Sequence, residues 1–196
     1  MNILAHSYLS GQSEEIKVGN FIGDYVKGHD YLKYKSEISK GIVLHRDIDN
    51  FTDNHVLVKK SIKRLRYDFR KYAGIIVDIF YDHFLCMSWS TYSSCNLQKY
   101  IDTLYKILLA HIQETPVEVQ DFLPRFIKND WLSYYDNIDG IAFVLDKMSQ
   151  NTSLPRNTDK AIEILKLHYD DFAAEFNVFF PELIQFVKTR HGIQIS

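Results

Sequence analysis

The sequence predicts an all-α protein, and three observations support this prediction. The chain has only four prolines and eight glycines in 196 residues, so few positions would break a helix. Strict alternation of apolar and polar residues, which is typical of half-buried strands, is scarce. Apolar residues instead recur at the spacing of an amphipathic helix in most windows. We therefore expect a single-domain helical bundle of about eight or nine helices, spanning residues 1–196.

The apolar periodicity gives the expected bounds of each helix in order. These are residues 2–10, 14–27, 36–50, 55–72, 74–89, 96–114, 117–135, 138–149 and 158–189. Thr115 and Pro116 indicate the start of the helix at 117, as a capping residue followed by a proline at the first helical position. Asn157 and Thr158 cap the last helix, and Pro181 predicts a break within it.

Composition narrows the class of protein. The net charge of −2 and a pI near 6.4 give no overall signal for binding nucleic acid or a membrane surface. Two cysteines cannot form a disulfide framework, which favours a reducing compartment. The N-terminus lacks the pattern of a signal peptide, and no apolar run reaches the ~20 residues of a membrane span. We expect a soluble cytoplasmic protein.

Four largely apolar segments in the first 90 residues carry isolated ionisable side chains. These side chains are His6 within 1–9, Asp24 within 18–26, His45 within 41–45, and Asp78, Asp82 and His83 within 74–87. At about 100° per residue, Asp78 and Asp82 share one helical face, as do His45 and Asp49. Buried carboxylates need a counter-charge, which a divalent cation can supply. Each residue taken singly is also compatible with a hydrogen-bonded core histidine or an exposed aspartate.

The mixture of imidazole and carboxylate side chains bears on which metal would bind. Without thiolates, such a set suits Mn²⁺, Fe²⁺ or Mg²⁺ better than structural Zn²⁺. These ions act as Lewis acids on phosphoryl oxygens and generate hydroxide from bound water. The residues alone therefore predict a metal-assisted hydrolase without naming its substrate.

Three motifs in residues 1–90 resemble those of bacterial acyl carrier protein phosphodiesterases. The first motif has two parts, Met1-Asn2-x-Leu4-Ala5-His6 and Gly19-Asn20-x-x-Gly23-Asp24-Tyr25-Val26-Lys27-Gly28. The second is Gly41-Ile42-x-Leu44-His45-Arg46-x-Ile48-Asp49-x-x-Thr52-Asp53. The third is Asp82-His83-Phe84-Leu85-x-x-x-Trp89. The resemblance implies an all-α, HD-domain-like phosphohydrolase that favours manganese. It implies cleavage of the phosphodiester between 4′-phosphopantetheine and the serine of holo-acyl carrier protein. The Asp82-His83 dipeptide reverses the His-Asp order that names the HD superfamily.

On this basis we expect one or two metal ions and a defined set of residues around them. The expected ligands are Asp24, His45, Asp82 and His83, followed by Asp49 and Asp78, with His6 as a ligand or as a partner that orients one. The expected catalytic residues are Asp24, His45, Asp49, Asp82, His83 and Arg46. Arg46 either offsets charge on the phosphate or pairs with a nearby acid.

A basic helix face gives a candidate surface for the carrier. Seven bases fall within an arc of about 160° on a helical wheel. They are Lys59, Lys60, Lys63, Arg64, Arg66, Arg70 and Lys71. We expect Lys59, Lys60, Lys63, Arg64, Arg70 and Lys71 to bind the acidic carrier, mainly by steering and orienting it. The alternative is a solvated helix face with no partner.

Two other functions remain open from the sequence. A phosphohydrolase of the same architecture could act on a nucleotide or another small phosphodiester, and it would need no basic docking surface. A non-catalytic helical binding protein would use the His/Asp cluster only as a structural hydrogen-bond network. It would bind no stoichiometric metal ion, and a chelator would not unfold it.

Overall fold

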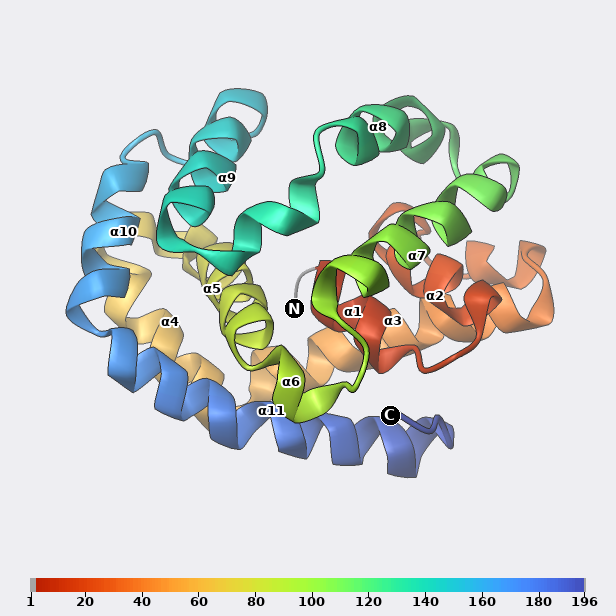
Figure 1. Cartoon of the computed structure of the whole chain (residues 1–196), viewed down its shortest axis with the longest axis horizontal. Helices are drawn as coiled ribbons and strands as arrows, with labels where there is room; N and C mark the ends of the chain where they lie inside the picture. Colours follow the sequence, from red (N-terminus) through yellow and green to blue (C-terminus); the bar gives the residue numbers. More distant parts are fainter. Residues whose placement is uncertain (1–2, 196) are drawn as a thin grey trace.

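The computed structural model describes residues 3–195, and all regular structure in this range is helical (Figure 1). The predicted all-α class is therefore confirmed. The α-helices are α1 (Ile3–Leu9), α2 (Glu14–Phe21), α3 (Ser36–Asn54), α4 (Val56–Phe69), α5 (Ala73–Met87), α6 (Trp89–Tyr92), α7 (Leu97–Ala110), α8 (Val117–Lys128), α9 (Ile138–Asn151), α10 (Thr158–Leu167) and α11 (Tyr169–His191). Short 3₁₀ helices cover Gly23–Tyr25, Asp30–Lys33, Arg70–Tyr72, Ile112–Glu114 and Trp131–Asp136.

The described range has eleven α-helices, more than expected, because residues 158–189 form two helices and α6 is separate from α5. Several expected helices also end early. The segment expected as one helix at 117–135 contains α8 and then a separate 3₁₀ helix. Asp130 stands between them with a positive φ of 47°. The α4 helix likewise ends where Arg70 takes a φ of 48°. A non-glycine residue in this region of φ stops the α-helical pattern, and apolar periodicity does not reveal it.

A break is found before Pro181, as expected, but it lies at His168 and Pro181 does not cause it. The break separates α10 from α11, and α11 continues through Pro181. Pro181 and Asn177, whose carbonyl loses its helical partner, are both exposed. Water can bind that carbonyl, so the proline is tolerated. The break lets α10 pack on α9 and α4 while α11 packs along α3, α4 and α5 (Figure 1).

Glycines on α2 and α3 bring these two helices unusually close together. A Cβ atom on Gly19 would overlap the carbonyl oxygen of Ile38, and one on Gly41 would overlap that of Ile16. Only glycine leaves room for this crossing. As a result, side chains on α3 reach the backbone of α2, which is the contact on which the candidate site depends.

One hydrophobic core extends through the described residues, from Leu4 on α1 to Ile195 beyond α11. The α5 helix contributes more buried residues than any other described helix, and α1 packs between α5 and α2 near the middle of the molecule (Figure 1). None of the described helices is both long enough and apolar enough to cross a membrane.

Candidate metal centre

Two buried histidines from different helices stack against each other in the interior. His6 on α1 and His45 on α3 have ring centroids 4.2 Å apart and an interplanar angle of 22°. Asp49 lies one turn after His45 on α3. Ligand atoms of His6, His45 and Asp49 all lie within 4.8 Å of one another, the distance range in which three side chains can share one ion.

Asn20 on α2 holds the outer nitrogen of each ring. Nδ1 of His45 lies 2.8 Å from the carbonyl oxygen of Asn20, which can only accept, so Nδ1 carries the hydrogen. The Asn20 amide nitrogen donates to the His6 carbonyl and to Ser10 Oγ. Its Oδ1 therefore accepts from Nδ1 of His6 at 2.7 Å. In the neutral form of both rings, Nε2 is left with the lone pair that binds metals.

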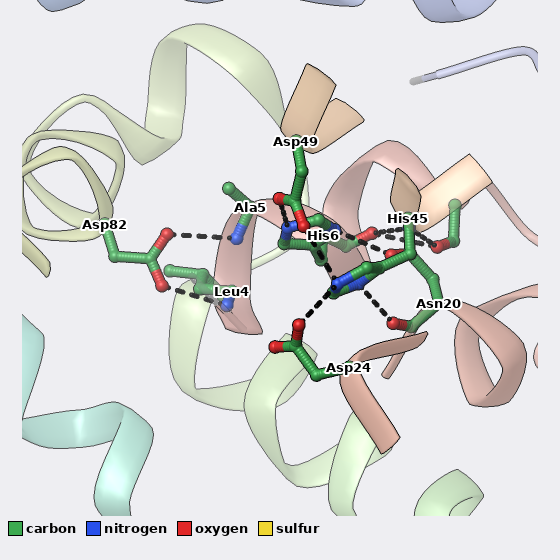
Figure 2. A network of polar contacts seen from close by, with 9 residues as sticks. Leu4, Ala5, His6, Asn20, Asp24, His45, Asp49 and Asp82 are labelled. Carbon is green, nitrogen blue, oxygen red and sulfur yellow. Dashed lines mark hydrogen bonds and ion pairs between the residues drawn. The ribbon is translucent and has the colours of Figure 1, made fainter. Parts of the chain in front are cut away.

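These two Nε2 atoms point at carboxylate oxygens (Figure 2). Nε2 of His6 lies 3.1 Å from Asp49 Oδ1, and Nε2 of His45 lies 3.0 Å from Asp49 Oδ2 and 3.3 Å from Asp24 Oδ1. The His45 nitrogen is buried, yet no group among the described residues gives it a well-directed hydrogen bond. A lone pair facing a carboxylate is repulsive unless a proton or a metal ion lies between them.

The spacing of these atoms fits a divalent ion. Ligand atoms at adjacent corners of an octahedral site with bonds of about 2.1 Å lie about 3 Å apart. The observed separations of 3.0 and 3.1 Å agree with this value. Because each ring donates its other N–H to a fixed acceptor, the orientation of both imidazoles is set before any ion binds.

The pKa values of these four side chains indicate which charge offsets the carboxylates when no metal ion is bound. Burial alone would lower the pKa of His45, but the carboxylates of Asp24 and Asp49 outweigh it and raise the pKa to about 9. Burial lowers the pKa of His6 to about 4, against the opposing effect of Asp49. The contact with His45 lowers the pKa of Asp24. Burial would raise the pKa of Asp49, but the contacts with His45 and His6 hold it well below its usual range. A single proton on His45 thus takes the place of a cation between two carboxylates.

Asp82 lies on the far side of α1 from this group. Its carboxylate is fully buried and accepts hydrogen bonds from the backbone N–H groups of Leu4 at 3.0 Å and Ala5 at 3.2 Å (Figure 2). Burial raises the pKa of Asp82 to about 7. The structure places Asp82 where it satisfies the first turn of the helix that carries His6, and not among the three clustered ligands.

His83 and Asp78 also lie outside the group of His6, His45 and Asp49. Both ring nitrogens of His83 have partners elsewhere, the carbonyl of Tyr135 at 2.8 Å and the hydroxyl of Tyr169 at 2.9 Å. Burial lowers the pKa of His83. Asp78, one turn before Asp82 on α5, is half-buried, and its desolvation raises its pKa with the charge of Asp49 adding to the shift.

Arg46 fixes the loop that follows Asp24. Its guanidinium donates to the carbonyls of Gly28 and Val26, both at 2.8 Å, and stands 5.3 Å from the centre of the Tyr31 ring. No ion pair between Arg46 and an acid is found among the described residues. Arg46 holds the backbone on the carboxyl side of Asp24 through these contacts.

No role for Asn20 was predicted from the sequence, whereas Gly23 was expected, with Gly19, to allow the close approach of a neighbouring element. A Cβ atom on Gly23 would overlap ring and Cβ atoms of His45, so the imidazole occupies the space that glycine leaves. Both residues stand in the Gly19-Asn20-x-x-Gly23-Asp24 motif. In the sequence, the position of Asn20 between Gly19 and Gly23 was the feature that could have indicated its role. This feature does not reveal that Asn20 contacts two other helices.

A pocket of about 280 Å³ opens beside the centre. His6, Asn20, Asp24 and His45 form its polar wall. The side chain of Asp24 is mostly exposed, at 79%. The pocket therefore gives a small molecule or a flexible chain access to the candidate metal ligands.

Comparisons with known proteins show the family of the chain. The family described as acyl carrier protein phosphodiesterase matches residues 1–183. This chain belongs to that family. Curated relatives with the same name include proteins from Pectobacterium atrosepticum, with 29% identity over 97% of this chain and 99% of the relative, and Yersinia enterocolitica, with 30% identity over 94% and 96%. A third, from Salmonella paratyphi A, is 31% identical over 94% of this chain and 96% of the relative. No solved structure gives a significant match.

Membership of the acyl carrier protein phosphodiesterase family identifies the chain as a phosphodiester hydrolase. The described residues also provide a possible His–His–Asp metal site, as such an enzyme would need. The residues alone predicted a metal-assisted hydrolase, and the family consists of hydrolases, so the two agree on the class of reaction.

In the structure, the basic residues expected to bind the carrier fall into two groups, one paired with a buried glutamate and one lining a groove. Arg64 forms a bidentate ion pair with the buried Glu175 on α11, with distances of 2.7 and 2.8 Å. Lys60 lies 3.0 Å from the same carboxylate. The remaining cations line a groove of about 460 Å³ that also includes Asp53, Ile62 and Gly74. These cations are Lys59, Lys63, Arg66, Arg70 and Lys71, which we call the basic groove.

Proposed function

We propose that this protein hydrolyses the phosphodiester between 4′-phosphopantetheine and the acceptor serine of holo-acyl carrier protein. The products would be apo-carrier and free phosphopantetheine. The observation that carries this proposal is the convergence of two imidazole lone pairs and the Asp49 carboxylate beside an open pocket, in a chain of this family. Such a site suits phosphodiester hydrolysis, since a bound cation can offset the negative charge on the phosphoryl oxygens and activate water.

We propose His6, His45 and Asp49 as the core of the metal site, with Asp24 contributing from the pocket side. The nitrogen and oxygen donor set, with no thiolate, suits Mn²⁺ and also Mg²⁺ or Fe²⁺. When bound, the ion would polarise a phosphoryl oxygen and lower the pKa of a coordinated water. Asn20 keeps the two Nε2 atoms aimed inward, and Asp82 fixes the helix that carries His6. Under this proposal Asp82, His83 and Asp78 support the site from outside the ligand group.

The proposed partner is the acyl carrier protein, docked at the basic groove. Its carboxylates would meet five cations that are balanced by Asp53 alone among the lining residues. Such complementarity mainly increases the association rate and fixes orientation. Lys60 and Arg64 are less suited to this role because Glu175 already neutralises part of their charge. We also propose a cytoplasmic location, with which the two free cysteines, Cys86 and Cys95, are compatible.

Intact-mass measurement of holo-acyl carrier protein incubated with the protein and Mn²⁺ tests the proposal. We expect loss of the phosphopantetheine mass, its prevention by chelator, and its near-abolition in Asp49→Asn. Asp102→Asn is the matched control, because Asp102 is an exposed aspartate on α7. An unchanged holo mass with stoichiometric Mn²⁺ bound would mean that another phosphodiester is the substrate. An unchanged mass with no metal bound would overturn the enzyme assignment.

A further inference from the structure

The pocket beside the metal centre has a second wall that is apolar. It lines the same cavity as the polar wall of His6, Asn20, Asp24 and His45. The apolar wall consists of Ile3, Phe21, Tyr25, Phe122 and Met148. A pocket with one metal-binding wall and one apolar wall suits a substrate whose phosphate is attached to a partly apolar group.

Two aromatic rings stack within this wall. The rings of Tyr25 and Phe122 have centroids 5.8 Å apart and an interplanar angle of 20°, and Phe122 also lies 6.1 Å from Phe21. Tyr25 follows Asp24 directly in sequence, so the aromatic wall begins one residue from the candidate ligands. Tyr25 is 42% exposed, so core packing alone does not explain its position. An exposed aromatic ring next to a metal site is a candidate for contact with substrate.

The connectivity of the proposed substrate determines which of its parts can enter the pocket. A phosphodiester phosphorus has two ester substituents, and here one is the serine of a folded carrier. A pocket of about 280 Å³ cannot admit a folded protein. The other substituent is the pantetheine arm, a slender chain. If phosphorus lies at the metal centre, the arm is the substituent that fits the pocket, while the carrier stays outside.

We propose that Tyr25 and Phe122 bind the first part of the phosphopantetheine arm and are specificity-determining residues. This inference depends on the function proposed above. Next to the phosphate, the arm carries a quaternary carbon with two methyl groups, which forms a compact apolar bulge. Two methyl groups against the faces of stacked rings lose water contact and gain close packing. A phosphodiester without this bulge lacks the contact, so the wall favours the arm over other alcohols.

The test compares two substrates in wild-type protein and in variants, with Mn²⁺ present. Holo-acyl carrier protein carries the arm, and bis(4-nitrophenyl) phosphate is a diester without it. For Phe122→Ala and Tyr25→Ala, we expect the ratio of kcat/KM for the carrier to kcat/KM for the model diester to fall about 10-fold or more, mainly through KM for the carrier. Phe122→Leu, which keeps an apolar side chain, should recover much of this loss. Phe143→Ala is the control, because Phe143 is a partly exposed aromatic residue of α9 outside the pocket.

The outcomes separate this inference from the proposed function. A substrate ratio unchanged in both alanine variants, with wild-type protein cleaving the carrier, would overturn the binding role of the aromatic wall and leave the function intact. Wild-type protein that binds Mn²⁺ but does not cleave the carrier would overturn both. Weaker inhibition by free 4′-phosphopantetheine in Tyr25→Gln, a polar substitution at a residue that is 42% exposed, than in wild type would support the inference even if Phe122→Ala folds poorly, and equal inhibition would contradict it.

Discussion

The backbone carbonyl of Asn20 accepts a hydrogen bond of 2.8 Å from Nδ1 of His45, and this contact decides which ring nitrogen can bind a cation. The Asn20 side chain does the same for His6. One residue of α2 therefore sets the tautomer of two histidines that come from α1 and α3. Such outer partners fix ring orientation, and their loss typically lowers metal affinity about 10- to 100-fold.

Substitution of Asn20 by alanine should weaken metal binding, and it should also lower the free energy of unfolding because it removes three buried hydrogen bonds. The change removes the acceptor for Nδ1 of His6 but keeps the backbone carbonyl that holds His45. We expect Mn²⁺ affinity to fall about 10- to 100-fold, measured by calorimetric titration of the full chain. Asn151→Ala is the control, because that residue is exposed at the end of α9. Wild-type affinity in Asn20→Ala would contradict the role of Asn20 in orienting His6.

A methyl group at position 23 should displace the ring of His45. Because a Cβ atom there overlaps the imidazole, Gly23→Ala should lower both Mn²⁺ binding and the free energy of unfolding, the latter by about 1–3 kcal/mol. Gly74→Ala is the matched control. Gly74 lies in α5, and the side chain of Ile62 would be 3.8 Å from the added Cβ, an ordinary contact distance, so this variant should be as stable as wild type or slightly more stable. Unchanged Mn²⁺ affinity in Gly23→Ala would show that His45 does not need its observed position.

The metal-free protein should lose stability as the pH rises from about 6.5 to 9. The pKa of His45 is raised in the folded state to about 9 from an unfolded value of 6.5. The stabilisation from its protonated form is therefore fully present below pH 6.5 and is lost as the pH rises through 9, with an upper bound of about 3 kcal/mol. Urea unfolding in chelator across this range measures the effect, and His45→Gln should remove most of the slope. Mn²⁺ binding should strengthen over the same range, since the ion must displace this proton.

Part of the candidate site follows from helical spacing, and part depends on packing that the sequence does not encode locally. His45 and Asp49 are one turn apart on α3, so their convergence was predictable. Asp82 was expected beside them because a buried carboxylate suggests a ligand. Its partners are instead backbone N–H groups of α1, and no side-chain pattern marks such an acceptor. The positions of the helix breaks at His168 and Asp130 escaped detection for a similar reason, because backbone torsion angles, not hydrophobic spacing, produce these breaks.

Asp82→Ala and Asp82→Asn should separate a structural role from metal ligation. Alanine leaves the buried N–H groups of Leu4 and Ala5 without their acceptor, which should cost about 2–4 kcal/mol of unfolding free energy. Asparagine keeps one acceptor oxygen, so Asp82→Asn should be less destabilised and should still bind Mn²⁺. If Asp82 were a direct ligand, the asparagine variant would lose Mn²⁺ binding with little change in stability. Thermal unfolding and metal titration of both variants distinguish these results.

Charge reversal in the basic groove tests where the carrier docks. Lys63 and Arg70 are exposed groove residues on and just after α4, so the double variant Lys63→Glu/Arg70→Glu should fold normally. We expect KM for holo-acyl carrier protein to rise about 10-fold or more, with little change in kcat and a weaker dependence of the rate on salt. Lys99→Glu/Lys106→Glu on α7 is the matched control, since both lysines are exposed and lie outside the groove.

Arg64 should be left out of that test, although its position in the sequence suggests a docking residue. Its guanidinium is only 14% exposed and is paired with Glu175, which is 4% exposed. Without Arg64, the buried carboxylate of Glu175 loses its main counter-charge, so Arg64→Glu should lower the free energy of unfolding by about 3–5 kcal/mol. A rise in KM in that variant would then mix a folding defect with lost docking. Normal KM in the groove variant, together with an unchanged salt dependence, would mean that the carrier approaches the metal centre by another face.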